Sequence, residues 1–124
     1  MVKTKHKKLT QIFDDTPVWG AVIFGSTAKN ETDFISDIDI MTFSDEPLSY
    51  NEYMNLYMSL TDTLNRDVDL VDFTTAKNPL LKSVRRNHRI LYGNKEDILH
   101  KLNTEITDEK AYIKDKSDIP NSQI

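Results

Sequence analysis

The sequence predicts an α/β (α+β) domain, in which a small mixed sheet is flanked by helices. Apolar runs of strand length alternate along the chain with longer stretches whose apolar residues recur at helical spacing. Turn-forming residues separate these stretches, most clearly at Gly25, at residues 44–47 and at Gly93-Asn94. The chain of 124 residues has the length of one domain with a buried core.

Three elements are expected in the first third of the chain. In order, they are a helix carrying Leu9, Ile12 and Phe13, a strand over residues 18–24 and a strand over residues 37–43. Gly25 ends the first strand, and Ser26 lies near the N-cap of a short helix over residues 26–29. The connection between the two strands is about a dozen residues long and does not decide whether they are parallel or antiparallel.

A helix over residues 49–65 is the clearest prediction in the middle of the chain. Ser49 and Glu52 have the spacing of a capping box. One apolar stripe is expected to pack in the core: Tyr50, Tyr53, Met54, Tyr57, Leu60 and Leu64. A third strand is predicted over residues 66–73.

The remaining elements are a helix, a short strand and a last helix. Asn78 is expected to be the N-cap of the first of these helices, with Pro79 at its first position. The strand is predicted over residues 90–92, and Asn94 is expected to cap the last helix. Residues 1–113 are expected to form a single domain, followed by a flexible tail over residues 114–124.

The composition excludes several classes of protein. Without cysteine, the chain has neither disulfides nor thiolate zinc sites. A net charge of −4 argues against direct nucleic-acid binding by electrostatics. No apolar run approaches the roughly 20 residues of a membrane helix, and no apolar segment follows the N-terminal lysines as in a secretory signal. We therefore expect a cytoplasmic protein that does not bind a membrane.

Three carboxylates lie in predicted strands. Asp37 and Asp39 are two residues apart, so their side chains point to the same face of the sheet. Asp69 lies inside the apolar stretch of residues 68–71 and can join them if the second and third strands are neighbours. Two carboxylates about 6 Å apart repel by roughly 2–3 kcal/mol at an effective dielectric constant near 20. Such a cluster needs a cation or raised pKa values.

Hard divalent ions such as Mg²⁺ take oxygen ligands and keep substrate phosphates in their coordination shell. The alternative is that the three acids are exposed strand-end residues paired with Lys or Arg. Gly25 and Ser26 favour the metal, because backbone N–H groups at a glycine turn and a helix N-terminus attract phosphate. The Ser26 hydroxyl adds a hydrogen-bond donor.

Gly-Ser, a gap of ten residues and Asp-x-Asp resemble the pattern of the DNA polymerase beta-like nucleotidyltransferases. The chain is most similar to the minimal nucleotidyltransferases (MNT), which are paired with HEPN-domain toxins. The resemblance covers roughly residues 18–92, with residues 68–71 matching the strand of the third carboxylate and residues 89–92 the closing Ile-Leu-Tyr stretch. It departs at the phosphate turn. Thr27, Lys29 and Asn30 stand where family members often have Arg, Arg and Gly.

The resemblance implies the polymerase beta-like nucleotidyltransferase fold and transfer of AMP from ATP to a hydroxyl, with release of pyrophosphate. It implies two Mg²⁺ ions, with Mn²⁺ as a substitute. Asp37 and Asp39 would hold both ions, and Asp69 would hold one and help to deprotonate the acceptor. Gly25, Ser26 and Lys29 would bind the nucleotide. The partner would be a HEPN-domain toxin. This chain would act as its antitoxin and neutralise it by modifying a tyrosine.

Two other functions compete with this interpretation. The chain could be a non-catalytic antitoxin that neutralises its partner by binding, with the acids as a surface. It could also be a nucleotidyltransferase that modifies a small molecule such as an antibiotic. Enzymes of that kind usually carry an additional helical domain for the acceptor, for which 124 residues leave little room. The small size favours an acceptor surface supplied by another protein.

Overall fold

The computed structural model describes residues 9–25 and 37–104. Helical residues 9–14 come first and helical residues 95–104 last. The elements between them are β1 (Gly20–Phe24), β2 (Ile38–Phe43), α2 (Tyr50–Leu64), β3 (Val68–Asp72), a 3₁₀ turn (Phe73–Thr75), α3 (Asn78–Arg86) and β4 (His88–Gly93).

The four strands form one mixed sheet in the order β3-β2-β1-β4. β1 pairs antiparallel with β2 and with β4, whereas β2 and β3 are parallel. A parallel pair needs a crossover connection, and α2 supplies it. The predicted mixed sheet is confirmed, and the first two strands are antiparallel.

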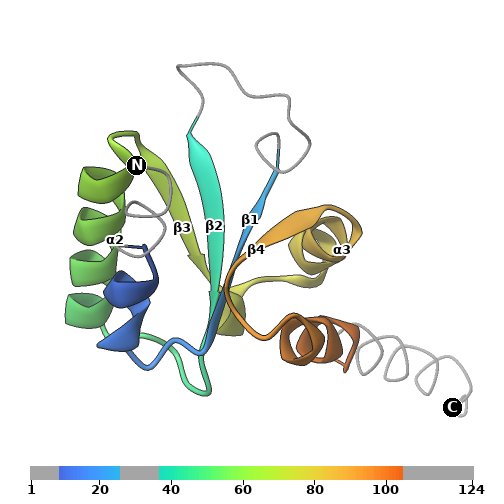
Figure 1. Cartoon of the computed structure of the whole chain (residues 1–124). Helices are drawn as coiled ribbons and strands as arrows, with labels where there is room; N and C mark the ends of the chain where they lie inside the picture. The colour runs from blue at the N-terminus through green and yellow to red at the C-terminus, as the bar shows by residue number, and fades with distance from the viewer. Residues whose placement is uncertain (1–8, 26–36, 105–124) are drawn as a thin grey trace, which may run out of the picture.

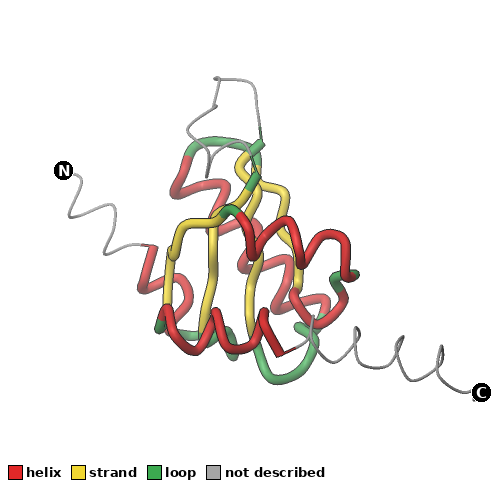
Figure 2. Tube along the Cα trace, turned by 90° about the vertical axis from the view of Figure 1, so that its right-hand side faces the viewer, coloured by secondary structure: helices red, strands yellow, loops and turns green. Residues whose placement is uncertain are grey.

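Helices cover both faces of the sheet (Figure 1). Residues 9–14 and α2 lie on one face, and α3 and residues 95–104 lie on the other, as the turned view also shows (Figure 2). Each face has its own apolar core. The core under α2 includes Phe13, Ala21, Ile40, Leu56 and Leu60, and the core under α3 includes Val22, Phe24, Met41, Phe43, Val84 and Ile98.

The capping box of α2 is confirmed. Ser49 Oγ accepts a hydrogen bond from the Glu52 N–H at 3.1 Å, and the Ser49 N–H donates to Glu52 Oε1 at 2.8 Å. The predicted apolar stripe is wrong at its first residue, because Tyr50 is 77% exposed. Tyr50 occupies the first position of α2. Leu56, which the stripe omitted, is buried instead.

The start of α3 is also corrected. Lys77, not Asn78, is the N-cap residue, and it makes no side-chain capping bond. Asn78 is already helical, with Pro79 after it. Asn94 does cap the last helix, since its Oδ1 accepts from the Asp97 N–H at 3.0 Å.

The described strands differ in length from the predicted ones, since β4 begins at His88 and β1 only at Gly20. The short helix predicted over residues 26–29 and the tail over residues 114–124 lie outside the described residues. Within the described ranges, no helix is long and apolar enough to cross a membrane.

Candidate active site

The candidate site lies where β1 ends and where β2 and β3 begin. Because β2 and β3 are parallel and β1 is antiparallel to them, these three strand ends meet at one edge of the sheet. Asp39 is in the central position. It pairs with Phe24 on β1 and with Asp69 on β3. The structure therefore places Asp69 directly beside Asp39.

The three carboxylates differ in exposure. Asp39 is half-buried, whereas Asp69 and Asp37 are exposed. Asp37 immediately precedes β2 and is two residues from Asp39, which places both on the face that α3 covers. Asp69 shares this face, because Val71, two residues further on, packs in the core under α3. β3 is an edge strand of the sheet, so Asp69 is open to solvent beside the more enclosed Asp39.

The environment of Asp39 raises its pKa above the ordinary value of 3.8. Burial is the largest cause, since it penalises the charged form. The negative charges of Asp69 and Asp37 raise the pKa further, as does a side-chain hydrogen bond with Asp69. In the absence of a cation, the charged form of Asp39 is therefore disfavoured.

Gly25 lies against Asp39. Its φ is +74°, in the left-handed region that favours glycine. A Cβ atom at this position would overlap Oδ2 of Asp39. The chain can turn out of β1 this close to the carboxylate only because residue 25 has no side chain. Gly25, the first residue of the predicted phosphate turn, thus lies directly against Asp39. Ser26 and Lys29, its other predicted residues, lie outside the described residues.

The carboxylates fit Mg²⁺ by the chemistry of their donors. Among the described residues, no three His, Cys, Asp or Glu side chains are close enough to enclose a metal ion by themselves. Mg²⁺ does not require such a cage, because it usually binds one or two carboxylates and completes its shell with water and substrate phosphates. The adjacent oxygens of Asp39 and Asp69 are ligands of this kind, and the raised pKa of Asp39 reflects a charge that a cation would relieve.

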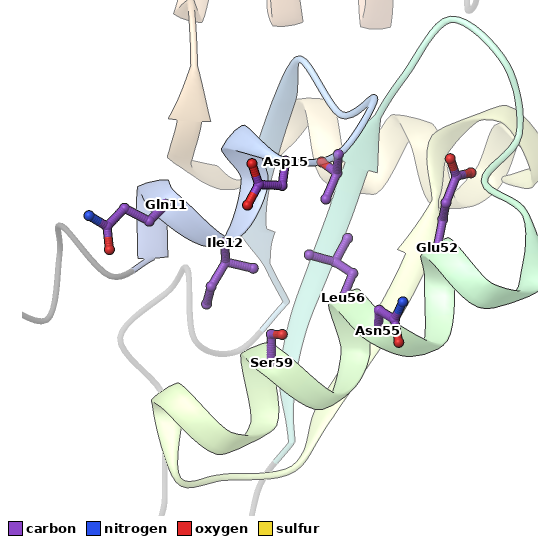
Figure 3. Close-up of a pocket in the computed structure, with 8 residues that line it drawn as sticks. Gln11, Ile12, Asp15, Glu52, Asn55, Leu56 and Ser59 are labelled. Carbon is purple, nitrogen blue, oxygen red and sulfur yellow. The ribbon is translucent and has the colours of Figure 1, made fainter.

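A separate hollow lies on the other face of the sheet, between residues 9–14 and α2 (Figure 3). Polar side chains, among them Asp15, Glu52 and Asn55, line it together with Ile12 and Leu56. Ile12 and Leu56 pack in the core under α2. Since the carboxylates lie on the α3 face, this hollow is no part of the candidate site.

One side chain near the site has no ligand-like neighbours in the sequence, which therefore assigns it no role. His88, the first residue of β4, pairs with Phe24 and therefore lies in the same row as Asp39 and Asp69. Nothing local in the sequence announces this position, because it follows from the antiparallel pairing of β1 and β4. Knowledge of that pairing would have been needed to find it.

The sequence model of the family described as "Polymerase beta, Nucleotidyltransferase" matches residues 7–97. The chain belongs to this family. It is therefore a nucleotidyltransferase, and the carboxylate row lies within the matched residues.

Two relatives from Methanocaldococcus jannaschii are named as protein adenylyltransferases, MJ0126 and MJ0128. They are 38% and 40% identical to this chain over 78 residues. The matched stretch is 63% of this chain and 78% of each relative.

Solved structures of toxin–antitoxin systems share the fold. A chain of a toxin–antitoxin crystal structure with AMP-PNP has a TM-score of 0.70 at 23% identity, and the match covers 96% of this chain and 98% of that one. A second match comes from the complex of a tri-AMPylated Shewanella oneidensis HEPN toxin with an MNT antitoxin. It has a TM-score of 0.69 at 22% identity and covers 98% of both chains.

Proposed function

We propose that this nucleotidyltransferase is an antitoxin that transfers AMP from ATP to a hydroxyl, a tyrosine hydroxyl in the first instance, of a partner HEPN toxin. The observation that carries the proposal is the placement of Asp39 between Asp69 and the Gly25 turn. It puts oxygen ligands for a divalent ion next to backbone that can approach a phosphate. The names of the relatives and the fold shared with toxin–antitoxin complexes support AMP as the transferred group and a HEPN toxin as the acceptor.

The reaction is an in-line displacement at the α-phosphorus of ATP. The acceptor oxygen forms a bond to that phosphorus, and the bond from the phosphorus to the oxygen that bridges to the β-phosphate breaks. Pyrophosphate leaves. Asp69 receives the proton of the acceptor hydroxyl, a role that suits an exposed carboxylate on an edge strand. Gly25, with Ser26 and Lys29 after it, binds the β- and γ-phosphates.

The chain's acids are suited to two divalent ions, Mg²⁺ or alternatively Mn²⁺. Asp37 and Asp39 would bind both ions, and Asp69 would bind one. Bound at these residues, the ions would neutralise phosphate charge and stabilise the attacking and leaving oxygens. The half-buried position of Asp39 fixes its carboxylate, while the exposure of Asp37 and Asp69 leaves room for substrate oxygens.

The proposal is tested with purified protein, Mg²⁺, α-labelled ATP and the HEPN-domain product of the adjacent gene. We expect label on the partner, on a tyrosine, and release of pyrophosphate. Asp37→Asn and Asp39→Asn should abolish labelling, because each removes a charged metal ligand. Asp45→Asn is a matched control, since Asp45 is an exposed aspartate just after β2. Substituting the other three nucleotides for ATP tests the preference for adenine.

The non-catalytic alternative makes the opposite prediction for the same variants. If Asp37→Asn combined with Asp39→Asn still neutralises the toxin in cells, neutralisation occurs by binding and the catalytic proposal is wrong. If label appears only on added small-molecule hydroxyl compounds and never on the partner, the acceptor is not a protein.

A further inference from the structure

His88 is an ionisable side chain in the same row as the carboxylates, and the reaction above has no role for it. Across the sheet, one row of residues reads Asp69, Asp39, Phe24 and His88. His88 shares the α3 face with Phe24, because Val22 and Ile90, two residues away on each strand, are also paired and pack in the core under α3. His88 is thus two strands from Asp39, about 10 Å at the usual strand spacing.

The imidazole ring of His88 is held by one of its two nitrogens. Nδ1 lies 2.8 Å from the carbonyl oxygen of Val84 in α3. A carbonyl oxygen can only accept a hydrogen bond, so Nδ1 carries the proton and donates it. No hydrogen bond links Nε2 to another described residue. The bond to Val84 explains how the ring is fixed, and it leaves the second nitrogen for another partner.

The two sides of the row have opposite charge. On the β3 side, Asp67 and Asp69 are exposed acids. On the β4 side, Arg85 and Arg86 are exposed in the last turn of α3, and only Asn87 separates them from His88. A polyanion that starts at the carboxylates is therefore repelled from the β3 side and attracted toward β4.

We propose that His88 binds the β- and γ-phosphates of the nucleotide and the pyrophosphate that leaves. This inference rests on the proposed function, which puts the α-phosphorus near Asp39 and Asp69 and the next phosphates at the Gly25 turn. Gly25 directly follows Phe24, the residue that separates Asp39 from His88 in the row. A triphosphate that continues in this direction reaches β4.

The chemistry of the ring suits this ligand. Because Nδ1 donates to Val84, Nε2 donates to a phosphate oxygen only as part of the imidazolium ion, and the phosphates supply the negative charge that favours this ion. His88 would thereby provide a charged contact to the phosphates in a chain that has Thr27 and Asn30 where family members often have Arg and Gly.

The test is calorimetric binding of three ligands, each with Mg²⁺: pyrophosphate, a non-hydrolysable ATP analogue and AMP. For His88→Ala we expect the Kd values for pyrophosphate and the ATP analogue to rise about tenfold, the effect of losing one charge-assisted hydrogen bond. The Kd for AMP should be unchanged. His88→Arg should recover most of the loss. His100→Ala is the matched control, because His100 is an exposed histidine on the last helix.

The inference is overturned if His88→Ala binds all three ligands as the wild-type protein does. It is equally overturned if binding of all three weakens together with a lower melting temperature, because the ring then serves only to hold the end of α3. A wild-type protein that binds neither pyrophosphate nor the ATP analogue contradicts the proposed function as well. A wild-type protein that binds both and labels its partner, with a silent His88→Ala, contradicts this inference alone.

Discussion

The β2–β3 pair carries an aspartate near each of its ends, and the two aspartates have opposite environments. Near the start of the pair, Asp39 faces Asp69, and its neighbours raise its pKa. Three residues further along, Thr42 pairs with Asp72, which is buried. Asp72 Oδ2 accepts from the Leu48 N–H at 2.9 Å, and Oδ1 accepts from the N–H and the hydroxyl of Thr74 at 2.9 and 2.7 Å.

The difference separates a structural carboxylate from a functional one. Three hydrogen bonds offset the desolvation cost of burying Asp72, and they hold the residues before α2 and after β3 in place. Asp39 is half-buried and lies close to the negative charges of Asp69 and Asp37, and all three effects raise its pKa. A protein keeps such an arrangement at a cost in stability, and a ligand that supplies positive charge removes the cost.

The largest expected effect is a loss of catalysis in Asp39→Asn. Removal of a charged metal ligand should lower the rate of AMP transfer more than about 100-fold. Even mutation of a residue that only hydrogen-bonds to a metal ligand typically lowers metal affinity or activity by about 10–100-fold. Asp72→Asn is the same chemical change at the other end of the strand pair. It should keep its rate per folded molecule but lose about 1–3 kcal/mol of stability. Transfer assays and urea denaturation measure the two effects. Equal behaviour of the variants would remove the distinction between the two ends.

Two glycines with positive φ allow a second comparison, between a backbone position at the candidate site and one away from it. Gly25 (φ +74°) and Gly93 (φ +92°) are both in the left-handed region, and an added Cβ would overlap Oδ2 of Asp39 or the carbonyl oxygen of Trp19, respectively. Each change to alanine should cost at least about 1–2 kcal/mol from the backbone conformation alone. Only Gly25→Ala should also abolish nucleotide binding, as measured by calorimetry. Loss of binding in a folded Gly93→Ala protein would contradict this.

The raised pKa of Asp39 predicts a pH-dependent stability difference in metal-free protein. Between the ordinary value of 3.8 and the raised native value, the native state binds more protons than the unfolded state, so stability falls as the pH rises. Asp39→Asn lacks this group. The free energy of unfolding of Asp39→Asn should equal that of the wild type below pH 3.8. It should exceed the wild-type value by a growing amount as the pH rises to the native pKa of Asp39, and by a constant amount above it. Urea denaturation in EDTA across this range measures it, and added Mg²⁺ should reduce it. If Asp39→Asn is no more stable than the wild type at neutral pH, the negative charge of Asp39 does not destabilise the metal-free protein.

The smallest expected effect concerns the N-cap of α2, near the Asp72 end of the β2–β3 pair. Ser49→Ala removes the capping bond of α2 and should cost about 1 kcal/mol, with no change in transfer rate. Ser59→Ala is the control, since Ser59 is an exposed residue inside the same helix, and its stability should change little. A change of transfer rate in Ser49→Ala would mean that the two ends of the sheet are coupled.

Much of the fold could be predicted because local rules decide it. The capping box of Ser49 and Glu52 fixes the start of α2, and apolar runs of strand length identify the strands. Predictions failed where a tertiary contact decides. The helical spacing of Tyr50 fits the stripe, but only the packing of α2 on the sheet shows that Leu56 is buried and Tyr50 is not. Likewise, Asn78 is a suitable capping residue, yet the backbone bends one residue earlier.

The site divides in the same way. Asp37 and Asp39 could be placed on one face from their spacing alone. The position of Asp69 depended on the pairing of β2 with β3, which the sequence allowed without requiring. His88 depended on the register of β4 against β1, which contains a bulge between Ala21 and Val22 and cannot be derived from the residues of either strand.

The most direct measurement of the central claim uses the paramagnetism of Mn²⁺. In ¹⁵N-labelled protein with a non-hydrolysable ATP analogue, substoichiometric Mn²⁺ broadens the amide resonances of residues close to the bound ion. We predict broadening that is strongest at Gly25, Asp39 and Asp69, weaker at Asp72 and Phe73, which lie about 10 Å further along the strand pair, and lost at all of these residues in Asp39→Asn. Broadening centred on the Asp72 end, or unchanged in Asp39→Asn, would contradict the assignment of these carboxylates to the metal-bound nucleotide.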